Sequence, residues 1–196
     1  MYIKEIIKNN DINLWLFELN KSFKHRSSEK IPYEELKYEN IKNTNLLGVF
    51  NDEDELIGGV TISYYIDYNN IKVAMIKHLW TKIDCQRQGI GSFLMKELEN
   101  IALKNNCQLL QLNVTNIYIP AVHLYEKSGF KKLMVYANVP GTYYFIRMIK
   151  SIGKYKFPEY KRIYELVKSI IVFKILFKSD SSPTFVHDKI YKKLKS

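Results

Sequence analysis

The order of apolar and polar positions predicts a chain in which strands surround two central helices. Apolar runs bounded by polar turns indicate strands, whereas apolar residues spaced three and four apart indicate helices. These criteria predict strands at residues 2–8, 46–50, 56–66, 71–81, 108–114, 130–139 and 142–150. They predict helices at residues 10–19, 33–38, 90–102 and 121–127, with a polar loop at residues 22–30. Helices lie between strands in the middle and hairpins lie on both sides, which indicates a mixed α+β class.

The most informative stretch is Gln-Arg-Gln-Gly-Ile-Gly at residues 86–91. It follows the strand-like residues 76–81 and precedes apolar residues that lie on one helix face: Ile90, Leu94, Leu98, Ile101 and Ala102. The first turn of a helix has unpartnered N–H groups and partial positive charge, and glycine lets a phosphate approach the backbone. This loop therefore suits a pyrophosphate, and Arg87 adds a positive charge. The alternative is a loop whose glycines only shape the turn.

Two common phosphate-binding loops do not fit these residues. The dinucleotide-binding fingerprint requires a third glycine, where this chain has Leu94. The P-loop requires Gly-Lys-Ser/Thr, which is absent here. The remaining pattern is Gln/Arg-x-x-Gly-x-Gly.

A second pattern, Ala-x-x-Leu-Tyr-x-x-x-Gly-Phe, occupies residues 121–130. Together, in this order, the two patterns resemble the signatures of the GNAT superfamily of N-acetyltransferases. The resemblance covers residues 1–150 and implies an acetyltransferase domain there. Its expected fold is a mostly antiparallel mixed sheet, splayed at the centre and flanked by helices. Residues 151–196 remain as a basic, partly helical C-terminal extension.

The resemblance also implies roles for individual residues. Acetyl-CoA would bind main-chain groups: Leu79, Trp80 and Thr81 for the pantetheine arm, and Arg87, Gln88, Gly89, Ile90, Gly91 and Ser92 for the pyrophosphate. The strands that carry Thr81 and Val114 would splay apart to admit the thioester. Tyr125 matches the tyrosine that protonates the departing thiolate, although a Leu-Tyr pair on a helix also suits core packing.

Two positions depart from the family pattern. Where some bacterial members have a glutamate general base, this chain has Asn113, which takes no proton at neutral pH. Where an asparagine often helps to hold CoA, this chain has Tyr118, and Asn116 nearby is the substitute we expect. The base then lies elsewhere, or a water chain deprotonates the amine. The residues considered as bases are His78, Asp67 and His123.

His78 has two interpretations. It alternates with Ile76 and Trp80, so we expect it to share their face of a strand, either as a base or as an ordinary sheet residue. Trp80 is expected to pack in the core, and the alternative is a wall of the substrate site. Cys85 precedes the glycine loop without a His/Asp partner pattern and is expected to be inert.

These residues indicate an N-acetyltransferase that moves an acetyl group from acetyl-CoA directly to a primary amine of a small molecule or peptide. The alternative is a non-catalytic acyl-CoA-binding module with a regulatory or interaction role. No nucleic-acid partner is expected, although the basic surface keeps nucleic-acid binding as a third and weaker hypothesis.

Composition sets broad limits on the partners and the compartment. The 196 residues carry a formal net charge of +10, which favours anionic partners and disfavours a polycationic acceptor. The two cysteines, Cys85 and Cys107, lack metal-ligand spacing, so we expect free thiols and no metal. No signal sequence and no apolar run long enough to span a bilayer are visible, which predicts a cytoplasmic protein.

The C-terminal extension contains an apolar segment interleaved with lysines. The spacing predicts a helix at residues 159–177, although residues 170–173 also suit a strand. Such a helix either packs on the domain or on a second subunit, which allows a homodimer, or lies on a membrane or an acidic partner. Residues 179–183 are expected to form a loop and residues 190–196 a frayed basic end.

Overall fold

The structure is a computed structural model that describes residues 1–26, 34–67, 69–139 and 143–177, with side chains described outside 137–143 and 174–177. Its strands are β1 (Tyr2–Glu5), β2 (Asn45–Phe50), β3 (Leu56–Ile66), β4 (Lys72–Thr81), β5 (Leu109–Thr115), β6 (Lys131–Val139) and β7 (Tyr143–Ser151). Its α-helices are α1 (Asn9–Arg26), α2 (Tyr38–Ile41), α3 (Ile90–Lys104), α4 (Ile119–Lys127) and α5 (Glu159–Phe177).

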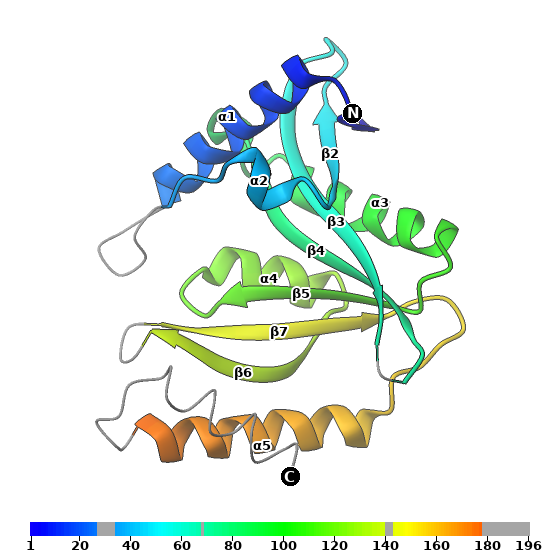
Figure 1. The fold of residues 1–196 in the computed structure, drawn as a ribbon, viewed down its shortest axis with the longest axis vertical. Helices are drawn as coiled ribbons and strands as arrows, with labels where there is room; N and C mark the ends of the chain where they lie inside the picture. Colours follow the sequence, from blue (N-terminus) through cyan, green and yellow to red (C-terminus); the bar gives the residue numbers. More distant parts are fainter. Residues whose placement is uncertain (27–33, 68, 140–142, 178–196) are drawn as a thin grey trace.

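The strands form one sheet in the order β1-β2-β3-β4-β5-β7-β6, with α4 beside β5 (Figure 1). All neighbouring strands are antiparallel except the central pair, β4 and β5. These two pair only from Val73–Ile76 to Leu109–Leu112 and then part, while β4 stays bonded to β3 and β5 to β7. The predicted splayed α+β sheet is confirmed.

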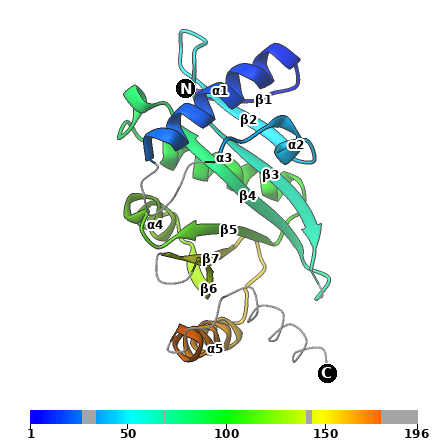
Figure 2. The same ribbon diagram turned by 60° about the vertical axis from the view of Figure 1, so that its left-hand side comes forward.

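Helices cover both faces of this sheet (Figure 2). On one face α3 and α4 bury their apolar sides against β2–β5 and β7 in the main hydrophobic core. On the other face α1 and α2 pack through a second core, in which Trp15 and Trp80 meet edge to face with ring centroids 5.8 Å apart. Gly59 lies beneath these two indoles and leaves no room for a side chain, since an added Cβ would come within 2.3 Å of Trp15 Nε1.

Two sequence predictions near the N-terminus were wrong. Residues 22–26 were expected in a polar loop, but α1 continues to Arg26. It does so because Ser22 is buried and bonds to the sheet, so tertiary contacts outweigh the polar composition of this stretch. The helix expected at residues 33–38 is instead the single turn α2 at Tyr38–Ile41, anchored by the fully buried Ile41.

A β-bulge interrupts the regular alternation of β4. Between Gly59 and Thr61 of β3, strand β4 has one more residue than its partner. His78 lies in this bulge, with the left-handed backbone φ of 51°. The expected shared face of Ile76, His78 and Trp80 is therefore wrong, because Ile76 packs in the core under α3 and Trp80 in the core under α1.

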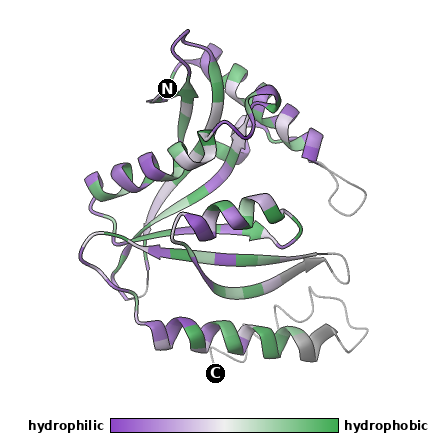
Figure 3. Ribbon diagram, turned by 180° about the vertical axis from the view of Figure 1, so that it is seen from behind, coloured by the Kyte–Doolittle hydropathy of each residue, from purple (hydrophilic) through white to green (hydrophobic). Residues whose placement is uncertain are grey.

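The helix predicted at residues 159–177 is confirmed as α5, and the strand alternative for residues 170–173 is wrong. It packs on the domain along β6, the edge strand of the sheet. Ser169 Oγ accepts the Val135 N–H at 2.9 Å, and Arg162 Nη1 donates to the Lys132 carbonyl at 2.7 Å. Hydrophobic and hydrophilic residues mix along the helix (Figure 3). Its outer side exposes several apolar residues: Tyr160, Ile163, Tyr164, Val167, Ile170 and Ile171.

Further predictions concern the cysteines, a membrane-spanning segment and the C-terminal end. Both cysteines are free thiols, with Cys107 buried and Cys85 half-buried. Among the described residues, no helix has the length and apolar character needed to cross a membrane. The expected loop at residues 179–183 and the basic end at 190–196 lie outside the described residues.

Candidate active site

The glycine loop connects the end of β4 to the start of α3, as predicted. After the short turn Ile83–Cys85, the residues from Gln86 to Gly89 are exposed. Arg87 and Gly89 both adopt left-handed backbone conformations, with φ of 63° and 83°. A Cβ on Gly89 would meet nothing within 4 Å, so glycine is favoured there by its backbone conformation and not by a lack of space.

The start of α3 presents free amide groups beside this loop. Its first intrahelical bond runs from the Phe93 N–H to the Gly89 carbonyl at 2.9 Å. The N–H groups of Ile90, Gly91 and Ser92 therefore have no acceptor within the helix. Ile90 is buried and fixes the first turn against the sheet, whereas Ser92 is exposed. These amides and the positive end of the helix dipole fit the phosphates of a nucleotide.

Gly91 has a different structural role from Gly89. A Cβ on Gly91 would come within 2.9 Å of Leu124 Cδ2, so this glycine allows α3 and α4 to pack closely. Leu124 precedes Tyr125 on α4. The glycine loop is thereby tied directly to the helix that carries the candidate general acid.

Tyr125 projects from α4 into the main core. Its side chain is 8% exposed, and its ring packs against Phe130 with centroids 6.2 Å apart. Within the described part of the chain its hydroxyl has no hydrogen-bond partner. Burial raises the pKa of Tyr125 to about 12, and the nearby charge of Arg26 partly offsets this rise. The phenol is therefore protonated at neutral pH, as a proton donor must be.

The end of β4 shows where main-chain groups become available. Past Ile76 the edge of β4 that faces β5 no longer has a partner strand. Leu79 is half-buried against the main core, and Trp80 is fully buried under α1, which confirms its expected packing role. Backbone groups at residues 77–81 on this edge can thus bind an extended ligand, as the pantetheine assignment for Leu79, Trp80 and Thr81 requires.

Comparison with known proteins now identifies the family. The Acetyltransferase (GNAT) family matches residues 13–130, more than half of the chain. The chain belongs to the GNAT family of acetyltransferases. This family membership supports acyl transfer in general.

One curated protein matches part of the chain. The uncharacterized protein YdhI of Bacillus subtilis (strain 168) is 28% identical over 88 residues, which are 45% of this chain and 51% of that protein. The chain thus spans about half the length of this curated relative.

Among solved structures, the fold is similar to three acetyltransferases of low sequence identity. The ribosomal-protein-S18-alanine N-acetyltransferase from Escherichia coli has a TM-score of 0.59 at 19% identity, covering 80% of this chain and 99% of that one. An aminoglycoside 6'-N-acetyltransferase complexed with coenzyme A has a TM-score of 0.59 at 16% identity, with 80% and 100% coverage. A GNAT acetyltransferase from Streptococcus pneumoniae has a TM-score of 0.60 at 21% identity, with 78% and 99% coverage. These likenesses concern the fold.

Asn113 and Asn116, the two asparagines near positions that depart from the GNAT pattern, make contacts within the sheet. Asn113 is exposed on β5, and its Oδ1 accepts from Arg147 Nε at 3.4 Å. Asn116 Oδ1 accepts the Tyr144 N–H at 2.9 Å, so this side-chain oxygen is already used to extend the pairing of β5 with β7. The CoA-binding role of Asn116 remains a prediction. It would use atoms of Asn116 other than Oδ1.

The three residues considered as a base lie in unlike surroundings. His78 Nδ1 lies 3.0 Å from Thr61 Oγ1, and burial lowers the pKa of His78 to about 4, with a further contribution from Lys77. Such an imidazole is a weak proton acceptor. Asp67 Oδ1 accepts the N–H groups of two turn residues, and His123 is exposed on α4.

Sequence reasoning missed Arg26, which the structure places near the candidate acid. Arg26 Nη2 donates to Ser22 Oγ at 3.2 Å, and Ser22 Oγ donates to the carbonyl of Thr81 at 3.1 Å. Its charge interacts with both Tyr118 and Tyr125. The helical spacing of Trp15, Leu19, Ser22 and Arg26 was the signal in the sequence that could have revealed this extension of α1.

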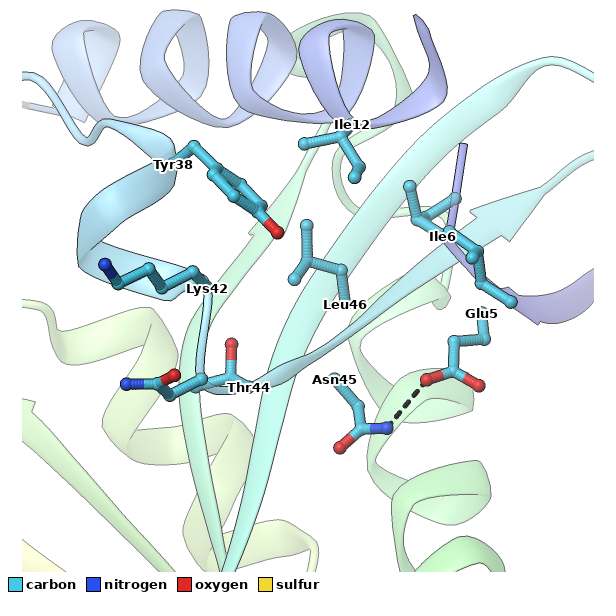
Figure 4. A pocket seen from close by; sticks show the side chains of 10 residues that line it. Glu5, Ile6, Ile12, Tyr38, Lys42, Thr44, Asn45 and Leu46 are labelled. Carbon is cyan, nitrogen blue, oxygen red and sulfur yellow. Dashed lines mark hydrogen bonds between the residues drawn. The ribbon is translucent and has the colours of Figure 1, made fainter. Parts of the chain in front are cut away.

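A surface depression of about 340 Å³ lies elsewhere, among residues of β1, α1, α2 and β2 (Figure 4). Its lining includes Ile6, Tyr38 and Leu46 but none of the predicted site residues. Asn45 closes one side by donating to Glu5 Oε1 at 2.6 Å. Across the part of the chain that the structure describes, no group of three His, Cys, Asp or Glu residues is arranged to hold a metal.

Proposed function

We propose that the protein is an N-acetyltransferase that moves an acetyl group from acetyl-CoA directly to a primary amine. The observation that carries this proposal is Tyr125, a buried residue whose phenol is protonated and whose hydroxyl has no hydrogen-bond partner among the described residues. It lies on the helix that packs against the glycine-loop helix through Gly91 and Leu124. The proposed phosphate-binding loop and the proposed proton donor would thereby lie on two helices in direct contact.

In this proposal the residues of the chain act by binding and by proton donation. The α3 amides and Arg87 hold the pyrophosphate, and the free edge of β4 binds the pantetheine arm. Acetyl-CoA supplies the acetyl group as a thioester. The acceptor nitrogen forms a bond to the acetyl carbon, the carbon–sulfur bond breaks, and Tyr125 protonates the departing sulfur. The proton lost by the amine passes to water, which returns one to Tyr125.

The proton balance of this site predicts its pH dependence. Neither Asn113 nor the weakly basic His78 is a suitable base near neutral pH. We therefore expect kcat/KM to rise with pH up to the pKa of the acceptor amine and then to level off. The raised pKa of Tyr125, about 12, keeps the acid protonated over this range, so no alkaline loss is expected below about pH 10. A fall near pH 8 would contradict the assignment of Tyr125.

The experiment that tests the proposal combines binding and turnover. Calorimetry gives the affinity for acetyl-CoA, and thiol release with a panel of primary amines gives the rate. Tyr125→Phe is expected to bind acetyl-CoA normally and to lower kcat by about 100-fold or more, as loss of a general acid does. Tyr160→Phe removes the hydroxyl of an exposed tyrosine on α5 and serves as the matched control, with no expected change.

A second candidate function is a non-catalytic acyl-CoA-binding module. It is favoured by Asn113, which replaces the acidic residue of some family members and here contacts Arg147. Tight acetyl-CoA binding without turnover of any amine would support this alternative. Absence of binding would reject both functions.

A further inference from the structure

Among the described residues, the guanidinium of Arg26 is anchored by hydrogen bonds but is not neutralised by a carboxylate. Its Nε donates to the Ser22 carbonyl at 3.3 Å and its Nη2 to Ser22 Oγ at 3.2 Å. A guanidinium has five N–H donors, so three have no acceptor among the residues that the structure describes. In the same part of the chain, no carboxylate lies within ion-pair distance of Arg26.

A half-buried guanidinium with unused N–H donors is unfavourable unless another group accepts hydrogen bonds from it. Burial lowers the pKa of Arg26, which reflects the cost of removing its charge from water. The C-terminus of α1 and the ring of Phe23, whose centroid lies 4.8 Å from Arg26 Cζ, provide part of the compensation. Neither accepts a hydrogen bond from the remaining donors. A planar fork of free N–H groups is the arrangement that binds oxyanions in a bidentate manner.

The position of Arg26 connects it to the reaction centre. Ser22 links it to the carbonyl of Thr81, the last residue of β4, where the central strands have parted. Tyr118, the N-cap residue of α4, and Tyr125 within α4 lie close enough to Arg26 to interact electrostatically with its charge. The guanidinium therefore lies near both the end of β4 and the proposed proton donor. An acceptor whose nitrogen reaches the thioester has its neighbouring atoms near this cation.

We infer that Arg26 binds an oxyanion of the acceptor, so that the substrates are small amines that carry a carboxylate or phosphate a few bonds from the nitrogen. Amino acids are the simplest members of this class. The inference rests on the proposed function and specifies its acceptor. It also agrees with the net charge of +10, which disfavours polycationic amines.

The test compares acceptors with and without the anionic group, each at the concentration of its unprotonated amine, because the group also changes the pKa of that amine. The carboxylate arm uses an amino acid and its carboxamide, and the phosphate arm uses phosphoethanolamine and ethanolamine. For the wild type we expect kcat/KM to favour the anionic member of at least one pair by about 30-fold or more, the size expected for a desolvated charge pair. In Arg26→Gln this preference should fall to within about threefold, while the rate with the neutral acceptor is retained.

Two further variants control for other effects of the substitution. Lys21→Gln removes the same charge from an exposed position of α1 and should leave the preference intact. Arg26→Lys keeps the charge but loses the planar fork, so its preference should be intermediate. An unchanged preference in Arg26→Gln would overturn the inference. So would an equal loss of kcat for anionic and neutral acceptors, which would place the effect of Arg26 on Tyr125 or the leaving sulfur.

A binding measurement separates this inference from the proposed function. With CoA present, calorimetry of the N-acetylated amino acid or of N-acetylphosphoethanolamine, whichever corresponds to the preferred acceptor, should show binding to the wild type and at least 10-fold weaker binding to Arg26→Gln. Binding of this kind without turnover of any amine would reject the transferase and retain the anion site. Turnover without an anionic preference would retain the transferase and reject the site. A thermal melt of each variant confirms that it is folded.

Discussion

The two sides of the candidate active site are built in different ways. The proposed donor side, comprising the glycine loop (residues 86–92) and Tyr125, uses main-chain amides at the start of α3 and one side chain of α4, which packs against α3. The proposed acceptor side is the last turn of α1, and its position depends on a long-range contact, the bond from the Ser22 side chain to the main-chain carbonyl of Thr81, 59 residues away. A site that binds its ligand through main-chain groups tolerates side-chain changes that preserve the backbone. A site that binds through side chains depends on how distant elements pack.

The largest expected effect comes from the contact that places α1 on the sheet. Gly59→Ala would put a Cβ 2.3 Å from Trp15 Nε1 and 2.7 Å from Trp80 Nε1, between two rigid rings. We expect it to lower the free energy of unfolding by about 3 kcal/mol or more, through overpacking. Urea denaturation measures this loss.

Gly91→Ala is the matched substitution on the donor side. Its Cβ would meet only the end of the flexible Leu124 side chain, so we expect a loss of about 1 kcal/mol. Equal losses in the two variants would show that packing is no stricter on the acceptor side.

The next effect concerns the backbone of the glycine loop. Gly89→Val forces a β-branched residue into the left-handed conformation, at a cost of about 2 kcal/mol, and should weaken acetyl-CoA binding by about 30-fold. Gly89→Asn adds a side chain that tolerates this conformation and should bind nearly normally. Calorimetry with acetyl-CoA separates the two, and equal weakening would indicate that side-chain bulk, not backbone conformation, matters at this position.

A smaller effect isolates the acceptor side. Ser22→Ala removes the hydroxyl that joins Arg26 to Thr81, which should cost about 1 kcal/mol in stability. Acetyl-CoA affinity should stay unchanged while KM for the acceptor rises by about fivefold, since about 1 kcal/mol of positioning is lost. A change confined to acetyl-CoA affinity would show that the division into two sides is wrong.

The smallest effect at neutral pH is expected for His78. Burial holds its pKa near 4, below the ordinary 6.5, so the unfolded chain binds the proton more readily. Its contribution to stability is therefore complete above pH 6.5 and is lost as the pH falls towards 4. His78→Asn keeps a residue that tolerates the left-handed φ of 51° and removes the titration. Its urea midpoint should fall less than that of the wild type between these pH values, and parallel curves would contradict the assignment.

The same division explains what the sequence could predict. The glycine loop, α3 and α4 follow from local spacing, and Gly89 and Gly129 adopt the left-handed conformations that glycine favours. Arg26 was missed because the continuation of α1 depends on a contact with a strand far along the chain. The bulge at His78 was missed because the extra residue is visible only against the register of the neighbouring strand. Features set by neighbouring residues could be predicted from the sequence, whereas contacts between distant segments could not.

Helix α5 has a consequence for the way molecules of this protein meet one another. The edge strand of a sheet can accept a strand from another molecule and so begin a growing ribbon. Here Ser169 and Arg162 occupy main-chain groups of β6 that such a strand would need. At the opposite edge, β1 has only four residues, which is a short template. Helix α5 therefore protects the β6 edge from aggregation. Its removal would expose β6 to pairing with other molecules and so to polymerisation.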